Sequence, residues 1–388
     1  MKIALCIDSF YPCIDGPINV TSSLASIFNR TDKCSVLAPS AKSKYVDNFS
    51  YDVIRCKSIS APENYRYALP SFDYGFRKKV EEQNFDIFHA HSPFSMGRYA
   101  IKTARRLHVP MIATFHTRYY DDFLRSTGSK MLAKALTDRI VKTYNDADEV
   151  WTVSNAAIDT LREYGYYGQC KVVRNGTDMK YPADADALVE EVNERHGIGG
   201  RQNVFLYVGR IAMYKNLPLF IKAFKLLKEN GIDFTVLIVG GGFDENLFKK
   251  QIDENGLSDR FIFVGSVSER KKLQGYYLRS DALVFPSTFD TSSLAPIEAA
   301  AHKKPSFVIN GSGSAEGIID GVNGFLCEEN EYDLAKTINA AIPHLRETGE
   351  NAALTVYRSW EQVAEEIYLM YENVRHRYAL TAENAVTV

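Results

Sequence analysis

Short apolar runs alternate with amphipathic stretches of helical length along the whole chain. In the first half, the apolar runs predict strands and the stretches between them predict helices. The strands are expected at 3–7, 35–38, 52–55, 87–90, 111–115, 149–153 and 171–173, and the helices at 20–28, 74–83, 97–107, 130–145 and 156–164. This alternation is typical of parallel strands joined by crossover helices. Apolar residues on both faces of the strands predict a sheet that is covered by helices on each side.

The second half repeats this plan after a polar, acidic stretch at 178–200, which predicts a linker and an entry helix. Its strands are expected at 204–208, 234–239, 261–264, 282–285, 306–309 and 325–327, and its helices at 217–229, 245–255, 269–279, 295–302 and 332–342. A last helical pattern begins at Ser359 and runs to about Tyr378. The predicted fold class is therefore α/β, with doubly wound domains at 1–178 and 179–359. We expect the C-terminal helix, about 360–388, to pack back on the first domain.

Length and composition agree with this division. A chain of 388 residues is too long for one typical core, and 45% hydrophobic with 24% charged residues is ordinary for a soluble globular protein. The sequence has no apolar run of about 18 residues, so we expect no membrane-spanning helix. The six cysteines form no CxxC pattern, which favours a reducing, cytoplasmic compartment.

The segment 285–298 carries the strongest chemical signal. An apolar strand leads through a loop of small residues into a helix, with Asp290 just before the helix and Glu298 about one turn inside it. The free N–H groups at such a helix start attract phosphate, while the two carboxylates are suited to accepting hydrogen bonds from sugar or ribose hydroxyls. A nucleotide-sugar needs both kinds of contact side by side. An ordinary loop with solvent-facing acids remains the alternative when this segment is taken alone.

A second candidate lies where the strand at 204–208 ends. Arg210 and Lys215 stand five residues apart in a loop that follows Gly209 and precedes a helix. Two cations on such a loop can reach one diphosphate and offset the charge of a departing nucleotide. A solvated loop is the alternative, and we favour the functional interpretation because the loop stands at a strand end.

Weaker signals follow other strands. Gly16 allows the backbone to approach a phosphate closely, although Pro17 beside it also fits a plain turn that begins a helix. Gly241 lies in a run of three glycines, and Val267 lies in a loop that can offer backbone groups to the edge of a base. Each of these is also explained by a tight turn.

Histidines end two strands of the first half. His89 and His91 are two residues apart and point the same way, which suits hydrogen bonding or a structural role better than metal binding, because no third ligand is near in sequence. His116 ends the next strand and can donate to a ligand hydroxyl or stabilise developing charge. A structural role for His116 is the alternative.

In order and spacing, these motifs resemble the family 4 glycosyltransferases, which are retaining enzymes of the GT-B architecture with two Rossmann-like domains facing across a cleft. The resemblance covers nearly the whole chain. The segments that carry it are 86–91, 114–117, 173–178, 208–216, 264–265, 285–287, 290–298 and 320–325. It implies an acceptor-side first domain and a second domain that binds the nucleotide-sugar donor.

The resemblance also implies roles for single residues. Arg210 and Lys215 would hold the donor diphosphate, Asp290 the sugar hydroxyls and Glu298 the ribose. His116 would lie near the C6 hydroxyl and anomeric carbon of the transferred sugar. Backbone groups would complete the donor site, from Gly16, Gly209, Gly241, Val267, Ser292, Ser293, Leu294 and Ala295. Catalysis would fall to His116, Arg210, Lys215 and Asp290.

Three departures from the family pattern stand out. Asp290 replaces the usual glutamate, the usual Gly-Gly is Asp15-Gly16-Pro17, and residues 291–294 replace a segment that usually contains Phe-Gly. None of them removes a cation needed at the leaving group. The shorter acid at 290 would alter sugar preference or turnover.

The expected reaction is transfer of a hexose from a nucleoside diphosphate sugar, first of all UDP-glucose, to an acceptor hydroxyl with retention. Such a hexosyltransferase would need no cofactor and no obligatory metal, since the two cations can take the place of one. The sequence has an Asp-x-Asp only at 146–148, where helix capping or a loop is expected. The alternatives are a non-catalytic partner subunit of a glycosyltransferase complex and a nucleotide-sugar epimerase of the same architecture. A dinucleotide oxidoreductase is disfavoured because neither domain opens with GxGxxG.

The acceptor is expected to be a membrane lipid or a growing glycan, with no nucleic acid involved. The stretch 130–142 is amphipathic and basic, with Lys130, Lys134, Arg139 and Lys142 among apolar residues, and Arg118 and Arg125 precede it. Such a segment can rest on anionic lipid, or it can be a packed helix with a solvated basic face. We therefore expect a cytoplasmic protein in peripheral contact with the inner face of the membrane.

Overall fold

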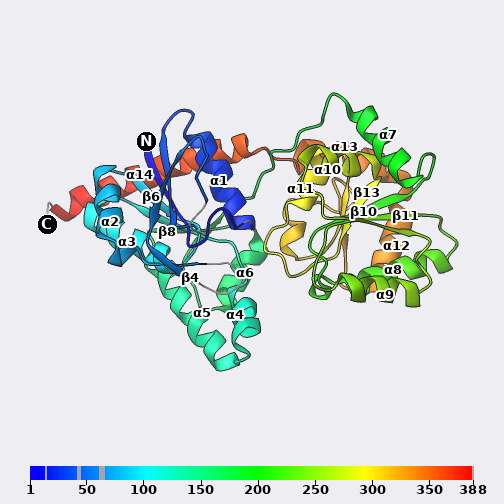
Figure 1. The fold of residues 1–388 in the computed structure, drawn as a ribbon, viewed down its shortest axis with the longest axis horizontal. Helices are drawn as coiled ribbons and strands as arrows, with labels where there is room; N and C mark the ends of the chain where they lie inside the picture. Colours follow the sequence, from blue (N-terminus) through cyan, green and yellow to red (C-terminus); the bar gives the residue numbers. More distant parts are fainter. Residues whose placement is uncertain (14, 42–44, 61–65, 387–388) are drawn as a thin grey trace. The chain divides into compact units, whose positions relative to one another are not determined.

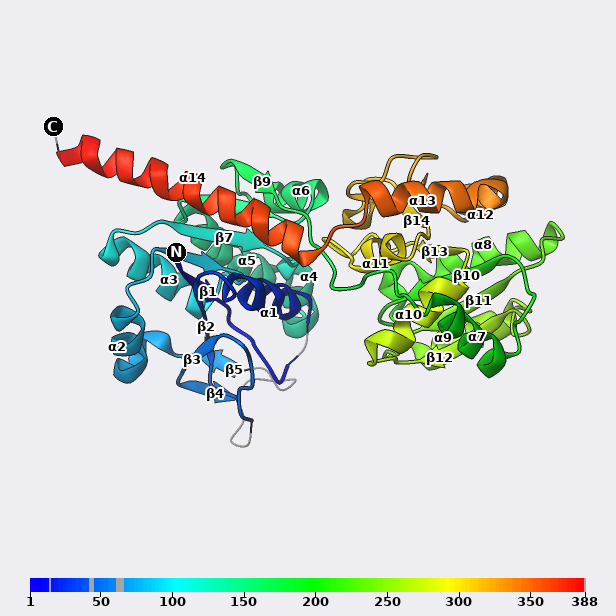
Figure 2. The same ribbon diagram turned by 90° about the horizontal axis from the view of Figure 1, so that it is seen from above.

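A computed structural model describes residues 1–13, 15–41, 45–60 and 66–386, with side chains up to residue 380. Ile14, in the loop after the first strand, and the last two residues of the expected C-terminal helix lie outside the described residues. The chain divides into one unit of Met1–Asn175 with Trp360–Val388, and a second unit of Gly176–Ser359. Each unit is a parallel sheet with helices on both faces (Figures 1 and 2), which confirms the predicted fold class of two Rossmann-like α/β domains.

Within the described residues, the sheet of the first unit has seven parallel strands in the order β3-β2-β1-β6-β7-β8-β9. Its strands are β1 (Lys2–Cys6), β2 (Lys33–Pro39), β3 (Asp52–Cys56), β6 (Ile87–Ala90), β7 (Met111–Phe115), β8 (Glu149–Thr152) and β9 (Cys170–Val172). The helices between them are α1 (Gly16–Phe28), α2 (Tyr74–Glu82), α3 (Ser95–Leu107), α4 (Tyr119–Thr127), α5 (Lys130–Asn145) and α6 (Asn155–Glu163). Almost every residue of the central strands is buried, as expected for strands covered on both faces.

The last helix of the chain, α14 (Trp360–Val386), belongs to the first unit. It lies beside the sheet of that unit (Figure 2), and Tyr371 is fully buried there. The Tyr371 ring stacks on Trp151 of β8 with centroids 5.7 Å apart, and it lies 5.8 Å from the ring of Phe28 at the end of α1. A helix from the C-terminal end of the sequence thus contributes to the core of the first unit.

The second unit has six parallel strands in the order β12-β11-β10-β13-β14-β15. These are β10 (Val204–Val208), β11 (Thr235–Val239), β12 (Phe261–Gly265), β13 (Ala282–Phe285), β14 (Ser306–Ile309) and β15 (Phe325–Cys327). Its helices are α7 (Ala185–His196), α8 (Leu217–Glu229), α9 (Glu245–Glu254), α10 (Arg270–Arg279), α11 (Ala295–Ala301), α12 (Glu331–Ala341) and α13 (Leu345–Thr355). In Figure 1, α8, α9 and α12 cover one face of the sheet, and α7, α10, α11 and α13 cover the other.

Some elements are not predicted by the sequence pattern. The short helices α4 and α13 are missed, as is the antiparallel pair β4 (Ser58–Ser60) and β5 (Arg66–Ala68). These elements bury few large apolar side chains, so no apolar pattern marks them: β4 buries none of its residues, α4 buries only Tyr119, and α13 buries Leu345 with a threonine, a glycine and an alanine.

Strand order reverses at one point in each sheet. In the first unit the chain leaves β1 towards β2 and returns to the other side of β1 as β6, and in the second unit β10 and β13 stand in the same relation. At such a point two loops leave the carboxyl ends of neighbouring strands in opposite directions, which leaves a crevice where ligands bind. We therefore expect ligands to bind at the loops after β1 and β6 and at those after β10 and β13.

Candidate active site

The loop after β10 is held by backbone contacts. Tyr207 donates a hydrogen bond from its hydroxyl to the carbonyl of Arg210 at 2.9 Å, and Gly209 donates to Val239 at 3.0 Å. The loop ends in a single 3₁₀ turn, Met213–Lys215, after which Asn216 takes a left-handed backbone with φ of 59° and α8 begins. This turn places Lys215 beside the carboxyl end of the sheet.

The glycine run after β11 serves chiefly to pack against that loop. A Cβ at Gly240 would lie 1.9 Å from the carbonyl oxygen of Gly209, and one at Gly242 would lie 2.0 Å from that of Ile211. Gly241, the candidate donor contact, would instead meet the side chain of Ser266 at 2.9 Å. Two of the three glycines are therefore explained by close backbone packing, in line with the tight-turn alternative. Only Gly241 faces a side chain instead of backbone.

Lys215 and Asp290 come together from the two sides of the strand-order reversal. The Lys215 ammonium lies 2.8 and 2.9 Å from the two carboxylate oxygens of Asp290, and the Ser287 hydroxyl donates to the same carboxylate at 2.6 Å. The exposed fractions of the two charged side chains are 11% and 23%, so the pair is largely shielded yet open to a ligand. Lys215 also lies 5.5 Å from the centre of the Phe285 ring.

Arg210 stands apart from this pair. Its side chain is exposed, and within the described residues it makes no ion pair. The structure therefore places only one of the two candidate diphosphate cations against a carboxylate. Gly209 is half-buried at the start of the loop, and a Cβ there would lie 3.3 Å from the Tyr207 hydroxyl and 3.4 Å from the Phe285 ring.

Glu298 is buried on α11 and fully engaged. It accepts from the Arg270 guanidinium at 2.9 Å and from the Tyr277 hydroxyl at 2.8 Å, both of which belong to α10. Burial raises the pKa of the Glu298 carboxyl above its ordinary value, against the lowering effect of Arg270 and Tyr277. Arg270 also pairs with Asp178, which links the start of the unit to this carboxylate.

His302 packs against Glu298 and Tyr277. His302 donates from Nδ1 to the backbone oxygen of Glu298 at 2.7 Å, and its ring is nearly parallel to that of Tyr277 with centroids 5.3 Å apart. Burial lowers the pKa of His302 to about 4, so the ring is neutral at neutral pH. Its Nε2 is buried without a hydrogen-bond partner among the described residues.

The loop between Asp290 and α11 holds the remaining candidates of the second unit. Ser292, Ser293 and Leu294 are half-buried, and Ala295, at the first position of α11, donates its N–H to the Ser293 hydroxyl at 3.3 Å. Gly313 supports the loop from behind. A Cβ on that glycine would lie 2.2 Å from the carbonyl oxygen of Thr291.

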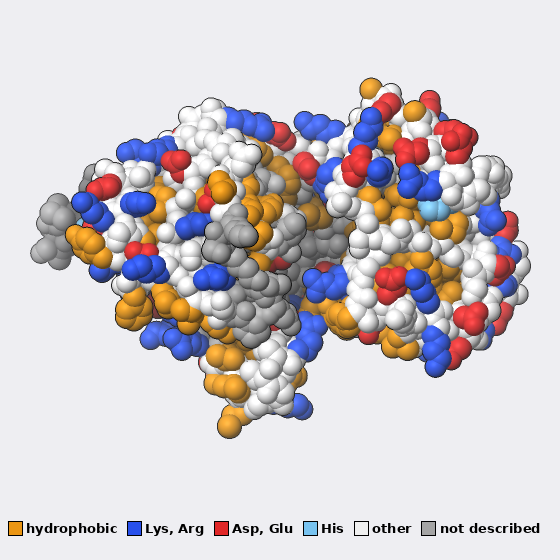
Figure 3. Space-filling model, in the orientation of Figure 1, with side chains coloured by type: hydrophobic (Ala, Val, Ile, Leu, Met, Phe, Trp, Pro, Cys, Tyr) orange, Lys and Arg blue, Asp and Glu red, His pale blue; other side chains and the backbone are white. Residues whose placement is uncertain are grey.

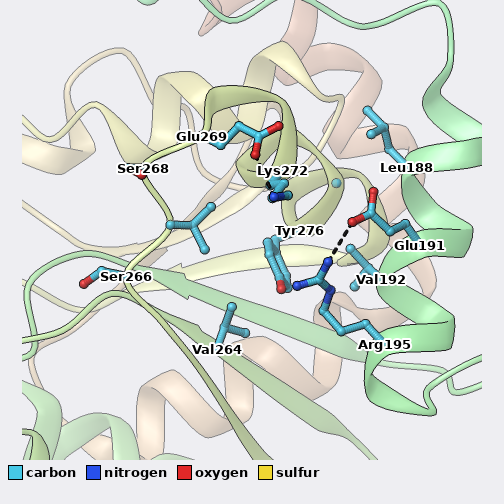
Figure 4. Close-up of a pocket in the computed structure, with 12 residues that line it drawn as sticks. Leu188, Glu191, Val192, Arg195, Val264, Ser266, Ser268, Glu269, Lys272 and Tyr276 are labelled. Atoms are coloured by element: carbon cyan, nitrogen blue, oxygen red, sulfur yellow. Dashed lines mark hydrogen bonds and ion pairs between the residues drawn. The ribbon is translucent and has the colours of Figure 1, made fainter.

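Val267 lines a pocket of about 270 Å³ between α7, α10 and the loop after β12. Figure 4 shows Tyr276 of α10 and Arg195 of α7 lining this pocket together. Its rim carries two ion pairs, Arg195 with Glu191 at 2.8 Å and Lys272 with Glu269 at 2.7 Å. The pocket therefore offers polar groups of both signs beside the loop that is expected to meet a base.

In the first unit, the loop after β1 is held by a residue that sequence reasoning did not identify. Asp8 accepts hydrogen bonds from the Ser95 hydroxyl and the Met96 N–H, both at 2.8 Å, and from the Ser92 hydroxyl and Phe94 N–H at 2.8 and 3.2 Å. This carboxylate therefore caps the start of α3 and joins the loops after β1 and β6. Burial raises the pKa of Asp8, despite these hydrogen bonds.

Gly16 is the first residue of α1. Asp15 caps this helix by accepting from the Ile18 N–H at 2.9 Å, and Pro17 stands beside Gly16 in the first turn. A Cβ on Gly16 would meet no atom within 4 Å, so the packing of the described residues does not itself require a glycine at this position.

The three candidate histidines of the first unit form one buried cluster. His91 Nδ1 lies 2.9 Å from His116 Nε2, and the rings of His89 and His91 lie 4.2 Å apart. His89 is held between the Tyr371 hydroxyl of α14 and the Thr114 hydroxyl of β7, both at 2.6 Å. Burial lowers the pKa of His89 to about 3 and that of His116 to about 4, so these rings are neutral near pH 7.

In the described part of the chain, no cluster of three or more histidine, cysteine or acidic side chains is placed to hold a metal ion. The Asp-x-Asp pair has structural roles. Asp146 ends α5, and Asp148 accepts from the Met111 N–H at 2.8 Å. None of the described helices combines the length and apolar character needed to cross a membrane.

Sequence reasoning missed several residues of these groups, namely Asp8, Arg270, Tyr277, Ser287, His302 and Tyr371. Arg270 had a usable signal, because it begins a helix after a short loop that follows a strand of the second unit. Asp8 had a similar one at the end of β1. Tyr371 had none, because nothing in the local pattern of α14 indicates that its hydroxyl meets His89.

The chain is similar to known glycosyltransferases along most of its length. Residues 189–355 match the family model described as Glycosyl transferases group 1, and residues 21–181 match the model Glycosyltransferase Family 4. The chain is 25% identical to the alpha-monoglucosyldiacylglycerol synthase of Streptococcus pneumoniae, across 88% of this chain and 78% of that one. It is also 25% identical to the GDP-mannose-dependent alpha-mannosyltransferase of Corynebacterium glutamicum, across 95% and 86%.

Among solved structures, Anabaena Alr3699/HepE in complex with UDP has a TM-score of 0.73 and 19% identity to this chain. The alignment covers 96% of this chain and all of that one, at 100%. At this level of identity the likeness shows a common fold.

Proposed function

The chain belongs to the family 4 glycosyltransferases, and from this premise we propose that it is a retaining hexosyltransferase that moves glucose from UDP-glucose to an acceptor hydroxyl. It is a GT-B glycosyltransferase that transfers a sugar to an acceptor. The proposal adds the donor, the stereochemistry and the class of acceptor.

The contact between Lys215 and Asp290 is the observation that carries the proposal. It joins the loops after β10 and β13, where strand order reverses. A diphosphate bound at this point would pair with the Lys215 ammonium in place of Asp290. The sugar attached to the diphosphate would then donate hydrogen bonds from its hydroxyls to the Asp290 carboxylate. Lys215 would then offset charge on the departing UDP, with exposed Arg210 supplying a second cation.

UDP-glucose is favoured as the donor by two likenesses. The Streptococcus relative is named alpha-monoglucosyldiacylglycerol synthase, and the HepE structure is a complex with UDP. Glu298 would accept from the ribose hydroxyls, because its carboxylate is already fixed by Arg270 and Tyr277. Val267 and the pocket beside it would meet the uracil.

Retention would follow from reaction on a single face of the sugar, with the leaving phosphate oxygen taking the acceptor proton. The engagement of the site carboxylates supports this path. Asp290 is bound to Lys215 and Ser287, and Glu298 to Arg270 and Tyr277, so each acts as a hydrogen-bond acceptor rather than as a free nucleophile. No metal ion would be required, since cationic side chains would take its part at the diphosphate.

The acceptor is proposed to be a membrane glycolipid precursor. The end of the α4 and α5 helix pair, residues 125–134 and here called the α4–α5 tip, exposes Met131 by 84% and Leu132 by 47%. Exposed Arg125, Lys130 and Lys134 surround them, and Figure 3 shows hydrophobic and basic side chains gathered over this end. Apolar side chains framed by cations suit the inner face of a membrane rich in anionic lipid.

The proposal is tested with full-length protein, UDP-glucose and vesicles containing diacylglycerol and an anionic phospholipid, in the presence of EDTA. We expect an alpha-linked glucolipid and free UDP. Replacing UDP-glucose by GDP-mannose or UDP-galactose under the same conditions compares the donors directly. Product with another donor would overturn the choice of glucose, and absence of both product and UDP binding would favour a non-catalytic partner subunit.

A further inference from the structure

His91 has an incomplete set of hydrogen bonds. Its Nδ1 lies 2.9 Å from Nε2 of His116, whereas its own Nε2 is buried and has no hydrogen-bond partner within the described residues. The residue is 1% exposed. Burial and the neighbouring histidines lower the pKa of His91 well below its ordinary value, which leaves one proton on the ring at neutral pH.

Two proton arrangements satisfy the contact with His116. In the first, His91 carries its proton on Nδ1 and donates it to Nε2 of His116, and the unpartnered Nε2 of His91 is a lone pair. In the second, His116 donates from Nε2, and His91 buries an unpartnered N–H. Orphaned buried N–H groups are rarer in proteins than under-satisfied acceptors, which favours the first arrangement.

His302 shows that this protein tolerates the first arrangement. Its Nδ1 lies 2.7 Å from the backbone oxygen of Glu298, and a carbonyl oxygen only accepts, so the proton of His302 is on Nδ1. The Nε2 of His302 is then a lone pair, and it too is buried without a described partner. A buried, unpartnered Nε2 lone pair therefore already occurs once in this fold.

We propose that His91 donates its Nδ1–H to His116 and thereby fixes the proton of His116 on Nδ1, which makes His91 a positioning residue for sugar transfer. The hydrogen bond made by one ring nitrogen decides which nitrogen of a histidine is protonated. The inference rests on the proposed sugar transfer in one respect, namely that His116 acts on the transferred sugar, as the family resemblance implies. The proton arrangement itself does not depend on it.

As a consequence, the same ring nitrogen of His116, Nδ1, carries the proton in every molecule of the protein. With its proton held on Nδ1, that nitrogen is always a donor and Nε2 always an acceptor occupied by His91. Without His91, the proton can move to Nε2, and Nδ1 then becomes a lone pair. A sugar hydroxyl or a developing charge at this ring would meet a donor only part of the time.

The direct test is nitrogen-15 NMR of histidine-labelled full-length protein, which distinguishes Nδ1–H from Nε2–H through the nitrogen shifts and the two-bond couplings to the carbon-bound ring hydrogens. His91→Leu and His116→Asn assign the two signals. In the wild type we expect both His91 and His116 to carry the proton on Nδ1. In His91→Leu we expect the His116 signal to move towards the Nε2–H form. A wild-type His116 with its proton on Nε2 would overturn the inference.

Kinetics provide the second readout. His91→Leu is expected to lower kcat by about tenfold, a fraction of what a positioned acid or base contributes, while KM for the donor changes less than about twofold. His91→Asn should restore most of kcat, because the asparagine amide nitrogen can occupy the place of Nδ1–H. Val150→Ala, a buried position on β8 in the same sheet, controls for loss of stability alone, and its kcat should stay near that of the wild type.

The two readouts separate the inference from the proposed function. A shifted His116 signal with unchanged kcat would keep the proton arrangement and reject the role of His116 in transfer. An unshifted signal in His91→Leu would reject the inference whatever the activity. Equal losses of kcat in His91→Asn and His91→Leu would show that ring packing, rather than the donated proton, is what matters.

Discussion

Lys215 and Asp290, 75 residues apart in sequence, form a pair in which one ammonium nitrogen lies within 2.9 Å of both carboxylate oxygens. The pair occupies the point where strand order reverses in the second sheet. A ligand that replaces both halves of the pair must present an anion to Lys215 and donors to Asp290. A sugar diphosphate has both, and simple phosphate has only the first.

Replacing Lys215 by methionine is expected to lower kcat by about 10²- to 10³-fold, the usual effect of removing a group that stabilises developing charge. The side chain keeps much of its length, so packing on the Phe285 ring is largely preserved. Release of UDP during transfer measures the effect. Lys222→Met on the exposed face of α8 is the matched control, since that lysine is 61% exposed, and equal losses in both variants would contradict a specific role.

Asp290→Asn is expected to separate binding of UDP from binding of UDP-glucose. The amide accepts poorly from sugar hydroxyls, so affinity for UDP-glucose should fall by about tenfold while affinity for UDP changes little. Titration calorimetry with each ligand measures both. If the two affinities fell together, Asp290 would be acting through Lys215 rather than on the sugar.

Asp290→Glu restores the acid that is usual in the family and moves the carboxylate outward by about one C–C bond. We expect a change in the ratio of kcat/KM between UDP-glucose and UDP-galactose, with little change in the melting temperature because the side chain is partly exposed. Parallel assays with both donors measure the ratio. An unchanged ratio would show that this position does not read the sugar.

The buried histidines of the first unit make stability depend on pH. In the unfolded chain a histidine binds a proton near pH 6.5, whereas the pKa is about 3 for His89 and about 4 for His116 in the folded protein. Between the folded and unfolded pKa values, the unfolded chain binds more protons than the folded protein does. The free energy of unfolding is therefore highest above pH 6.5, as far as these histidines are concerned, and it falls as pH decreases.

Each such histidine contributes a slope of about 1.4 kcal/mol per pH unit below pH 6. His116→Asn removes one of them, so the slope of stability against pH between 6 and 4.5 should decrease by about that amount. Urea unfolding monitored by tryptophan fluorescence at several pH values gives the slope, since Trp151 lies in this unit. A slope unchanged by the substitution would show that His116 is protonated in the folded state.

The α4–α5 tip is expected to govern membrane contact. Met131→Ser with Leu132→Ser should weaken binding to vesicles of anionic phospholipid by about tenfold, since two exposed apolar side chains are lost, and should leave binding of UDP unchanged. Vesicle sedimentation measures the effect. Leu354→Ser on α13, where the leucine is 81% exposed, is the matched control. Unchanged binding in the double variant would place the membrane contact elsewhere.

How far the sequence predicts the structure depends on the range of the contacts involved. Helices α5 and α8 have the bounds that their amphipathic pattern predicts, because a long helix repeats its pattern over several turns. Lys215 and Asp290 were singled out because each lies in a loop that follows a strand, and Glu298 because it lies in the helix after such a loop, where parallel sheets collect functional groups. Their roles in binding a donor stay predictions. The pairing of Lys215 with Asp290 was not predicted, because it depends on the order of the strands in the sheet. Neither of the two local segments indicates that order.

Contacts that depend on tertiary structure alone stayed hidden. Asp8 carries no signal of its partners in its local sequence, yet it organises the start of α3 through hydrogen bonds to residues more than 80 positions away. The glycine run after β11 suggested a ligand loop, whereas two of its members give room to backbone from the loop after β10. In both cases the contact depends on how two loops pack against each other, and the local sequence pattern does not predict that packing.

The place of Tyr371 in the first unit bears on how the protein is made. Synthesis delivers residues 1–175 first, but their sheet lacks the ring that packs on Trp151 and the hydroxyl that meets His89 until α14 has left the ribosome. The second unit, Gly176–Ser359, is continuous in sequence and is complete before α14 emerges. The domain that begins the chain is therefore the last to be finished, and a nascent chain halted before residue 371 holds its apolar face open to chaperones.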